Sequence, residues 1–167
     1  MGGNGPGVLF VCMGNICRSP SAEAVFLRHL EASALAGQIS VDSAGTIGYH
    51  EGNPADVRMQ HHAGLRGYRL RSRARKVVNE DFHRFDLIVA MDRDNLADLQ
   101  ARRPSSATCE LRLFCDFVPS DDAPRDVPDP YYGGAEGFER VLDLLEEGVT
   151  GLLDYIASRR AGGGQPE

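Results

Sequence analysis

The sequence has no apolar run long enough to span a bilayer, so a membrane-spanning protein is not expected. Its first residues, MGGNGPG, lack the basic region and apolar core of a signal peptide, and Pro6 stands where a myristoylation site requires Ser or Thr. An excess of positive charge is also missing. The 18 Lys and Arg against 24 Asp and Glu give a net charge of −6, which disfavours a general nucleic-acid binder. With four cysteines and no secretory signal, the sequence predicts a cytoplasmic protein with reduced thiols.

The composition is that of one globular domain. Hydrophobic residues make up 42% of the 167 residues and charged residues 25%, and a chain of this length can bury a sizeable core. Neither an internal repeat nor a linker interrupts residues 8–160. We therefore predict one domain over residues 1–167, with an ordered core at about 7–160 and flexible, Gly-rich tails at 1–6 and 161–167.

Short apolar runs alternate with segments of helical periodicity along the chain. The segments that predict strands are the apolar runs at residues 8–12 and 86–91, the weakly alternating segment at 39–44 and the stretch around Leu111 and Leu113. Helices are expected from the Ser19-Pro20 start to about Leu30, from Asn53-Pro54 to about Gly64 or Gly67, in a short turn capped by Asn79, over 92–102, and from Phe138 to Ile156. This order predicts an α/β fold: a single-domain, three-layer sandwich with a central four-stranded parallel sheet and helices on both faces.

The loop after the first expected strand carries the most informative residues. Ligands of parallel sheets bind beyond the carboxyl ends of the strands, and the sequence CMGNICRS occupies that place at residues 12–19. A loop leading into a helix directs backbone N–H groups and the positive end of the helix dipole at one point, which suits a phosphate group. Arg18 can bind two phosphate oxygens at once, and the same positive field favours a thiolate at Cys12. A thiolate below a bound phosphoryl group is a nucleophile aimed at phosphorus.

The spacing of Cys12 and Arg18 does not decide the matter alone, since an inert core cysteine and a solvated arginine would show the same spacing. The context favours chemistry, because a buried strand ends at Cys12 and a turn is indicated by Gly14 and Asn15. Ser19 is then expected to cap the helix that follows. These signals together predict a phosphate-binding loop.

A second reactive group has to protonate the oxygen of the leaving group. Candidates in the Pro- and Asp-rich stretch at about 116–134 are Asp116, Asp121, Asp122, Asp126 and Asp129. Asp129 is set apart by Pro130, which restricts the residue before it, and by Tyr131-Tyr132, an aromatic pair suited to wall a cleft for an aryl substrate. An ordinary Asp-Pro turn with surface tyrosines is the alternative that composition alone favours.

Together these residues resemble the low-molecular-weight protein tyrosine phosphatases. The segment CMGNICRSP resembles the amino-terminal signature of that family and DPYYGG resembles its acid loop, while DSAGT and AMDRDN follow in the family's order. The likeness covers about residues 7–160. It implies hydrolysis of phosphotyrosine and aryl phosphate monoesters through a phosphocysteine intermediate, with no metal and no other cofactor.

The resemblance also assigns roles to matching positions. It implies that Cys12 is the nucleophile, that Arg18 binds phosphate and stabilises the transition state, and that Asp129 is first the general acid and then the general base. The other residues implied to bind substrate or phosphate, or to shape the loop, are Met13, Gly14, Asn15, Ile16, Cys17, Ser19, Ser43, Tyr49, Tyr131 and Tyr132. Among these, Asn15 has the side chain best suited to a left-handed backbone conformation.

Three further positions bear on the resemblance. Cys17 matches a second loop cysteine of the family, which implies a reversible disulfide with Cys12 on oxidation; a small residue that fills the loop is the alternative. Tyr49 stands where many relatives carry tryptophan at the rim of the cleft, so aromatic specificity is still expected. Ser72 stands where some relatives carry histidine, and no role of that histidine carries over.

The remaining clusters of charged residues, histidines and cysteines say less about function than the loop at residues 12–19. The run from Arg66 to Lys76 holds six basic residues and no acidic one, which is typical of a solvated loop or of a surface that attracts an acidic or phosphorylated partner. His50, His61 and His62 form no metal set, and Cys109 and Cys115 are expected to be core thiols.

Other functions fit the same scaffold less well. An arsenate reductase would need further redox cysteines, and residues 91–101 contain none. A carrier subunit phosphorylated on cysteine is disfavoured by Arg18, which would promote hydrolysis of the intermediate. A catalytically inactive phosphoprotein binder would not need the nucleophile, the arginine and the acid together. We expect a phosphotyrosine-containing protein substrate, phosphate or a similar anion in the loop, no nucleic acid or membrane, and a monomer or weak oligomer.

Overall fold

A computed structural model of the protein describes residues 6–163 and contains the predicted sheet. Within these residues the strands are β1 (Gly7–Cys12), β2 (Ser40–Gly45), β3 (Leu87–Ala90) and β4 (Glu110–Leu113). They form one sheet in the order β2-β1-β3-β4, and each neighbouring pair is parallel. The four-stranded parallel sheet is therefore confirmed, and the bounds of each strand lie within about a residue of the segment predicted for it.

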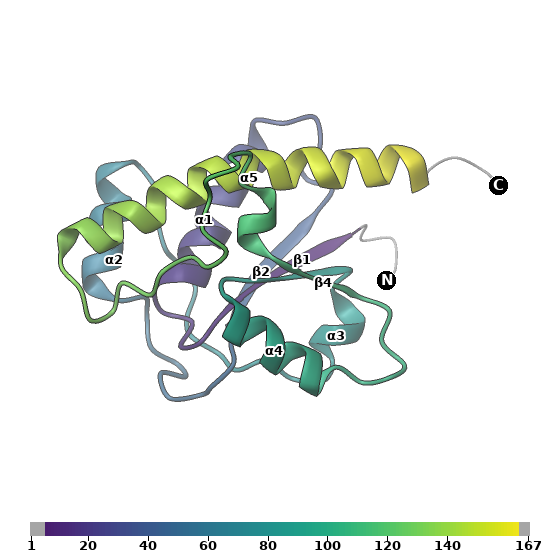
Figure 1. Ribbon diagram of the computed structural model, residues 1–167, viewed down its shortest axis with the longest axis horizontal. Helices are drawn as coiled ribbons and strands as arrows, with labels where there is room; N and C mark the ends of the chain where they lie inside the picture. The colour runs from purple at the N-terminus through teal and green to yellow at the C-terminus, as the bar shows by residue number, and fades with distance from the viewer. Residues whose placement is uncertain (1–5, 164–167) are drawn as a thin grey trace.

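Helices cover both faces of this sheet (Figure 1). Helices α1 (Arg18–Glu31) and α5 (Ala135–Gly163) lie on one face, and α3 (Asp81–Arg84) and α4 (Arg93–Arg102) lie on the other. Helix α2 (Val57–Leu65) packs against α5, as does the 3₁₀ helix η2 (Phe114–Phe117) that follows β4. The expected three-layer arrangement is thus confirmed.

Strand β1 lies in the middle of the core and is buried along its whole length. Val8 and Phe10 join the hydrophobic cluster under α1 and α5, whereas Leu9 and Val11 join the cluster on the opposite face. This explains why the strand is a continuous apolar run rather than an alternating one. Because both faces are packed, the carboxyl end of β1 is held rigidly, and Cys12 stands at that end.

The expected helix start at Ser19 is wrong. Helix α1 begins at Arg18, Cys17 occupies the N-cap position, and no side chain caps the helix there. Ser19 is instead the second helical residue, and its hydroxyl lies beside the Cys12 sulfur. Pro20 is accepted as the third residue because the first N–H groups of a helix have no intrahelical partner.

The predicted starts of two later helices are also wrong. Helix α2 begins at Val57 rather than at Asn53-Pro54, because the carboxylate of Asp56 accepts the backbone N–H groups of the first turn. Helix α3 begins at Asp81, and Asn79 does not cap it. The carboxylate of Asp81 accepts the N–H of Val78 instead and holds that turn from inside the helix.

The carboxyl-terminal helix is longer than its apolar stripe predicts. Helix α5 continues to Gly163, which is three residues into the stretch expected to be a tail. The rest of the two expected tails, residues 1–5 and 164–167, lies outside the described residues. Among the helices of residues 6–163, none has both the length and the apolar character needed to cross a membrane.

Candidate functional site

A cleft of about 270 Å³ opens where β1 runs into α1. All three predicted catalytic residues line it: Cys12, Arg18 and Asp129. So do seven of the predicted binding residues, namely Met13, Gly14, Ile16, Cys17, Tyr49, Tyr131 and Tyr132. Asn15, Ser19 and Ser43 are buried behind this surface and complete the predicted set.

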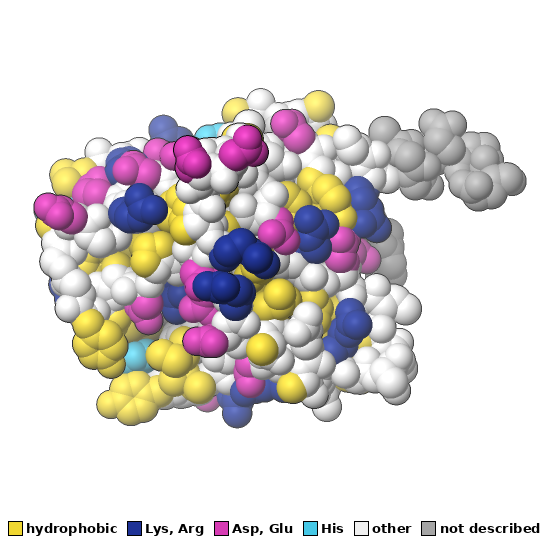
Figure 2. All heavy atoms as spheres, in the orientation of Figure 1, with side chains coloured by type: hydrophobic (Ala, Val, Ile, Leu, Met, Phe, Trp, Pro, Cys, Tyr) yellow, Lys and Arg dark blue, Asp and Glu magenta, His cyan; other side chains and the backbone are white. Residues whose placement is uncertain are grey.

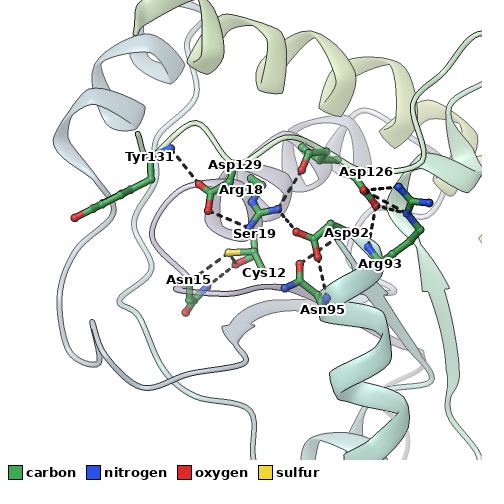
Figure 3. Close-up of polar contacts among 11 residues, drawn as sticks. Cys12, Asn15, Arg18, Ser19, Asp92, Arg93, Asn95, Asp126, Asp129 and Tyr131 are labelled. Atoms are coloured by element: carbon green, nitrogen blue, oxygen red, sulfur yellow. Dashed lines mark hydrogen bonds and ion pairs between the residues drawn. The ribbon is translucent and has the colours of Figure 1, made fainter. Parts of the chain in front are cut away.

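The sulfur of Cys12 is surrounded by hydrogen-bond donors (Figure 3). The backbone N–H of Asn15 donates to Cys12 Sγ at 3.2 Å, and Ser19 Oγ lies 3.1 Å from the same sulfur. The amide of Asn15 donates to Ser19 Oγ at 2.8 Å and to Ser43 Oγ at 3.0 Å. The Ser19 hydroxyl, which accepts the Asn15 amide, has two acceptors within reach of its own proton: the Cys12 sulfur at 3.1 Å and the Ala44 carbonyl at 3.4 Å.

Two unusual backbone features allow the loop to close around the sulfur. Asn15 has φ of +60°, the left-handed conformation expected for it, and its side-chain Oδ1 accepts the N–H of Arg75 at 2.9 Å. Gly45, at the end of β2, passes so close to the loop that a Cβ there would lie 2.7 Å from the carbonyl oxygen of Met13. Any larger residue at position 45 would displace the loop.

Arg18 is buried and held at three points around its guanidinium. Its Nη1 donates to Asp92 Oδ2 at 2.7 Å and to the carbonyl of Val127 at 3.0 Å, and its Nη2 lies 3.5 Å from Asp129 Oδ2. Burial alone would lower the pKa of Arg18, but the charges of Cys12, Asp92 and Asp129 outweigh it and raise that pKa above its ordinary value. The arginine is therefore a permanent cation facing the sulfur.

Asp92 is a site residue that the sequence analysis missed. It follows β3 directly and is the N-cap of α4, so it stands at the same sheet edge as Cys12. The rule that ligands gather at the carboxyl ends of parallel strands points to the residues after Met91, where Asp92 stands, but it does not single out Asp92 among them. Its function in this structure is to fix one nitrogen of Arg18 and leave the other facing the cleft.

Among the acidic residues of the long loop, the structure distinguishes Asp129. Its Oδ1 accepts the backbone N–H of Tyr131 at 3.0 Å, and its side chain is 35% exposed toward the cleft. Asp126 instead pairs with Arg93 at 3.0 Å, on the outside of α4. Of the five acidic candidates in this loop, Asp129 is the one that lines the cleft together with Cys12 and Arg18.

The rim of the cleft is apolar and aromatic. Tyr49 is 82% exposed and Tyr132 is 90% exposed, while Ile47 and His50 line the wall beneath them. Figure 2 shows hydrophobic side chains gathered over the end of the molecule where these loops lie. Ile47 and His50 were missed, although the end of β2 was an expected position for chemistry. A flat aryl group fits such a wall.

The other cysteines differ from Cys12 in their surroundings. Burial, and next the negative charge of Asp56, raise the pKa of the Cys17 thiol far above its usual range, so Cys17 stays protonated at neutral pH. Cys109 and Cys115 are buried, carry free thiols and do not line the cleft, which confirms them as core residues.

The basic run is partly neutralised within the molecule. Arg66 forms ion pairs with Glu139, Asp143 and Glu146 on α5, and Arg75 pairs with Asp42 and Asp81. Two of the three histidines considered above have local contacts: His62 pairs with Glu139, and His50 belongs to the cleft wall. Within residues 6–163 no group of three or more His, Cys, Asp or Glu side chains is arranged to hold a metal ion.

Known proteins share both the fold and the sequence of this chain. A family model described as low molecular weight phosphotyrosine protein phosphatase matches residues 7–161. A low molecular weight protein-tyrosine-phosphatase of Streptomyces coelicolor is 43% identical, over 93% of this chain and 96% of the relative. The crystal structure of an Entamoeba histolytica protein tyrosine phosphatase with Hepes in the active site has a TM-score of 0.88 and 43% identity, covering 93% of this chain and 99% of the other. The Drosophila arginine phosphatase DARP has a TM-score of 0.82 and 33% identity, over 89% and 96% of the two chains.

Proposed function

Because this chain belongs to the low molecular weight phosphotyrosine protein phosphatase family, we propose that it hydrolyses phosphotyrosine in proteins with Cys12, Arg18 and Asp129 as its reacting groups. The Cys12 thiolate attacks phosphorus, forming a P–S bond as the P–O bond to the phenol breaks. Asp129 gives its proton to the departing oxygen. Water then attacks the phosphocysteine, Asp129 takes a proton from that water, and phosphate leaves with the thiolate restored.

The observation that carries this proposal is the meeting of three groups in one cleft. A sulfur held by two donors, a buried guanidinium and a half-exposed carboxylate all face the same space. Arg18 and the N–H groups at the start of α1 are suited to hold the non-bridging phosphoryl oxygens, where negative charge is carried through the reaction.

The competing functions find less support in the cleft. Arsenate reduction would need a relay of cysteines, but Cys109 and Cys115 lie outside it. Phosphoarginine, suggested by the name of DARP, carries its phosphoryl group on a flexible alkyl stem and has no aryl ring to pack on the aromatic wall. An aryl phosphate suits that wall better, since Tyr49 and Tyr131 offer stacking surfaces.

The substrate is tested with matched phosphopeptides that carry phosphotyrosine, phosphoserine or phosphoarginine at one position. With a metal chelator present, we expect release of phosphate from the phosphotyrosine peptide at least about 100-fold faster than from the others, because only its leaving group is an aryl oxygen held by the aromatic wall. Faster release from phosphoarginine, or loss of all activity with the chelator, would refute the assignment.

We further propose that the protein is cytoplasmic, acts as a monomer or weak oligomer, and binds inorganic phosphate in its loop. The four free thiols support a reducing compartment, because oxidation of Cys12 would abolish the nucleophile. Cell fractionation tests the compartment, and sedimentation with and without phosphate tests the assembly and the anion.

Replacing Asp129 with alanine is expected to slow substrates according to their leaving group. For phenyl phosphate, kcat/KM should fall about 100-fold or more, because phenolate leaves poorly without a proton. For p-nitrophenyl phosphate, whose nitrophenolate needs little protonation, the fall should be about tenfold or less. Asp121→Ala is the matched control, because Asp121 is an exposed carboxylate of the same loop that does not line the cleft. Equal losses for both substrates would contradict the role of Asp129.

Peroxide is expected to inactivate the enzyme through a bond between Cys12 and Cys17. Peroxide oxidises the Cys12 thiolate to a sulfenic acid, and the Cys17 sulfur then displaces hydroxide to form the disulfide. Because burial and Asp56 raise the pKa of Cys17, this second step should accelerate as the pH rises. A thiol reductant should restore the wild type but not Cys17→Ser; equal recovery in both would reject the protective role.

A further inference from the structure

Arg58 lies between the two loops that carry the reacting groups, although it does not itself line the cleft. It belongs to the first turn of α2, and its side chain is 47% exposed. Surface arginines of this kind usually contribute little to a fold. Arg58 is different because its hydrogen bonds lead to both of these loops.

On one side, Arg58 is tied to the phosphate loop through Asp56. The Nε and Nη2 of Arg58 donate to the two carboxylate oxygens of Asp56, at 3.1 and 2.9 Å. The backbone N–H of Asp56 donates to the carbonyl of Ile16 at 2.9 Å. The carboxylate of Asp56 is 10% exposed and also caps α2, so it cannot move without disturbing that helix.

On the other side, Arg58 holds the acid loop. Its Nη2 donates to the carbonyl of Tyr131 at 3.0 Å, and its guanidinium stacks on the Tyr131 ring at 5.4 Å and on the Phe138 ring at 5.0 Å. The N–H of that same Tyr131 donates to Asp129 Oδ1 at 3.0 Å. The residue that Arg58 holds by its carbonyl is thus the residue that orients the general acid by its N–H.

The acid loop depends on such contacts because it has little structure of its own. Residues 118–134 contain no helix or strand, and Asp129 reaches Arg18 only at 3.5 Å. Proton transfer requires the carboxyl within hydrogen-bond reach of the leaving oxygen, and a displacement of about 1 Å can cost about 100-fold in rate.

We propose that Arg58, paired with Asp56, is a positioning residue that clasps the acid loop to the phosphate loop and so places Asp129 for proton transfer. This inference rests on the proposed phosphatase function, and it adds a residue that acts only through Asp129. The clasp affects the proton-transfer step and leaves the anion pocket around Cys12 and Arg18 unchanged.

The first test compares two aryl phosphates with Arg58→Ala. Loss of the clasp should lower kcat/KM for phenyl phosphate about 10- to 30-fold and for p-nitrophenyl phosphate no more than about threefold, because only the first substrate needs the acid strongly. The inhibition constant of inorganic phosphate should stay within about twofold of wild type. Equal losses for both substrates, or weakened inhibition by phosphate, would overturn the proposal.

The second test asks whether Arg58 acts through Asp129. In an Asp129→Ala background, Arg58→Ala should change kcat/KM for phenyl phosphate by less than about twofold, whereas an independent role would give additive losses. Asp56→Asn should reproduce part of the leaving-group effect, because asparagine still caps α2 but loses the ionic pairing. Additive losses would overturn the proposal.

Controls separate positioning from folding. Arg71→Ala removes an exposed arginine of the basic run and should leave both substrates unaffected. If Arg58→Ala unfolds, Arg58→Lys is used, because it keeps the charge and stem but not the forked pairing; it should show the same leaving-group difference, and uniform loss would overturn the proposal. Failure of the proposed function itself is distinct, since wild type would then hydrolyse neither aryl phosphate.

Discussion

Replacing Cys12 with serine is expected to abolish turnover and to leave the fold and the anion pocket intact. The serine hydroxyl is not ionised at neutral pH, so the donors around position 12 no longer stabilise an attacking anion. We expect kcat to fall at least about 10⁵-fold, the scale seen when a covalent nucleophile is removed. The measurement is phosphate release from phenyl phosphate at saturating substrate.

A measurement of phosphate binding distinguishes the loss of the nucleophile from a loss of the anion pocket. The N–H groups of the loop and Arg18 are unchanged in Cys12→Ser, so inorganic phosphate should still bind and raise the melting temperature. Cys109→Ala, which alters a buried thiol outside the cleft, is the matched control and should remain active. Turnover by Cys12→Ser within about 100-fold of wild type would contradict the assigned nucleophile.

Replacing Arg18 is expected to have the second-largest effect, on both catalysis and stability. Arg18→Ala should lower kcat/KM at least about 10³-fold, because the phosphoryl oxygens lose a fixed cation as the bond to the leaving group breaks. It should also destabilise the fold by about 1–3 kcal/mol, since Asp92 and the Val127 carbonyl lose their donor. Steady-state kinetics and denaturant unfolding measure the two effects.

Two further variants separate the effect of the forked donor geometry of Arg18 from the effect of its charge. Arg18→Lys keeps the charge but not the forked donor, so most of the catalytic loss should persist while part of the stability returns. Arg93→Ala removes a neighbouring arginine from an exposed ion pair with Asp126 and should change stability by less than about 1 kcal/mol. Near-normal activity of Arg18→Lys would show that charge alone suffices.

Much of the fold was predictable because its two central strands, β1 and β3, are buried on both faces. A strand covered by helices on two sides must be a continuous apolar run, and β1 and β3 lie where such runs stand. The outer strands β2 and β4 carry polar residues and gave a weaker signal. Helix starts were less predictable. Ser19 has the residue type of a cap, but its hydroxyl is used by the Cys12 sulfur, and that competition exists only in the folded chain.

Some residues of the candidate site could likewise be predicted from the sequence, and others could not. Cys12 and Arg18 are close in sequence, so a single loop and helix start bring them together, and local pattern was enough to find them. Asp92 and Asp129 come from distant segments, and nothing in the local pattern around Asp92 says that it will hold Arg18. Pro130 and the tyrosine pair set Asp129 apart from four other acidic candidates, but its hydrogen bond with the N–H of Tyr131 and its contact with Arg18 are seen only in the folded chain.

The order of residues alone determined the alternation of strands and helices, the phosphate loop and its nucleophile, because these depend on neighbours within about one turn or one strand. The tertiary structure decided which carboxylates meet the arginine, which rings line the rim, and that Arg58 contacts Tyr131, 73 residues further along the chain. Contacts of that kind depend on how the layers pack, and packing is a property of the whole chain rather than of any segment.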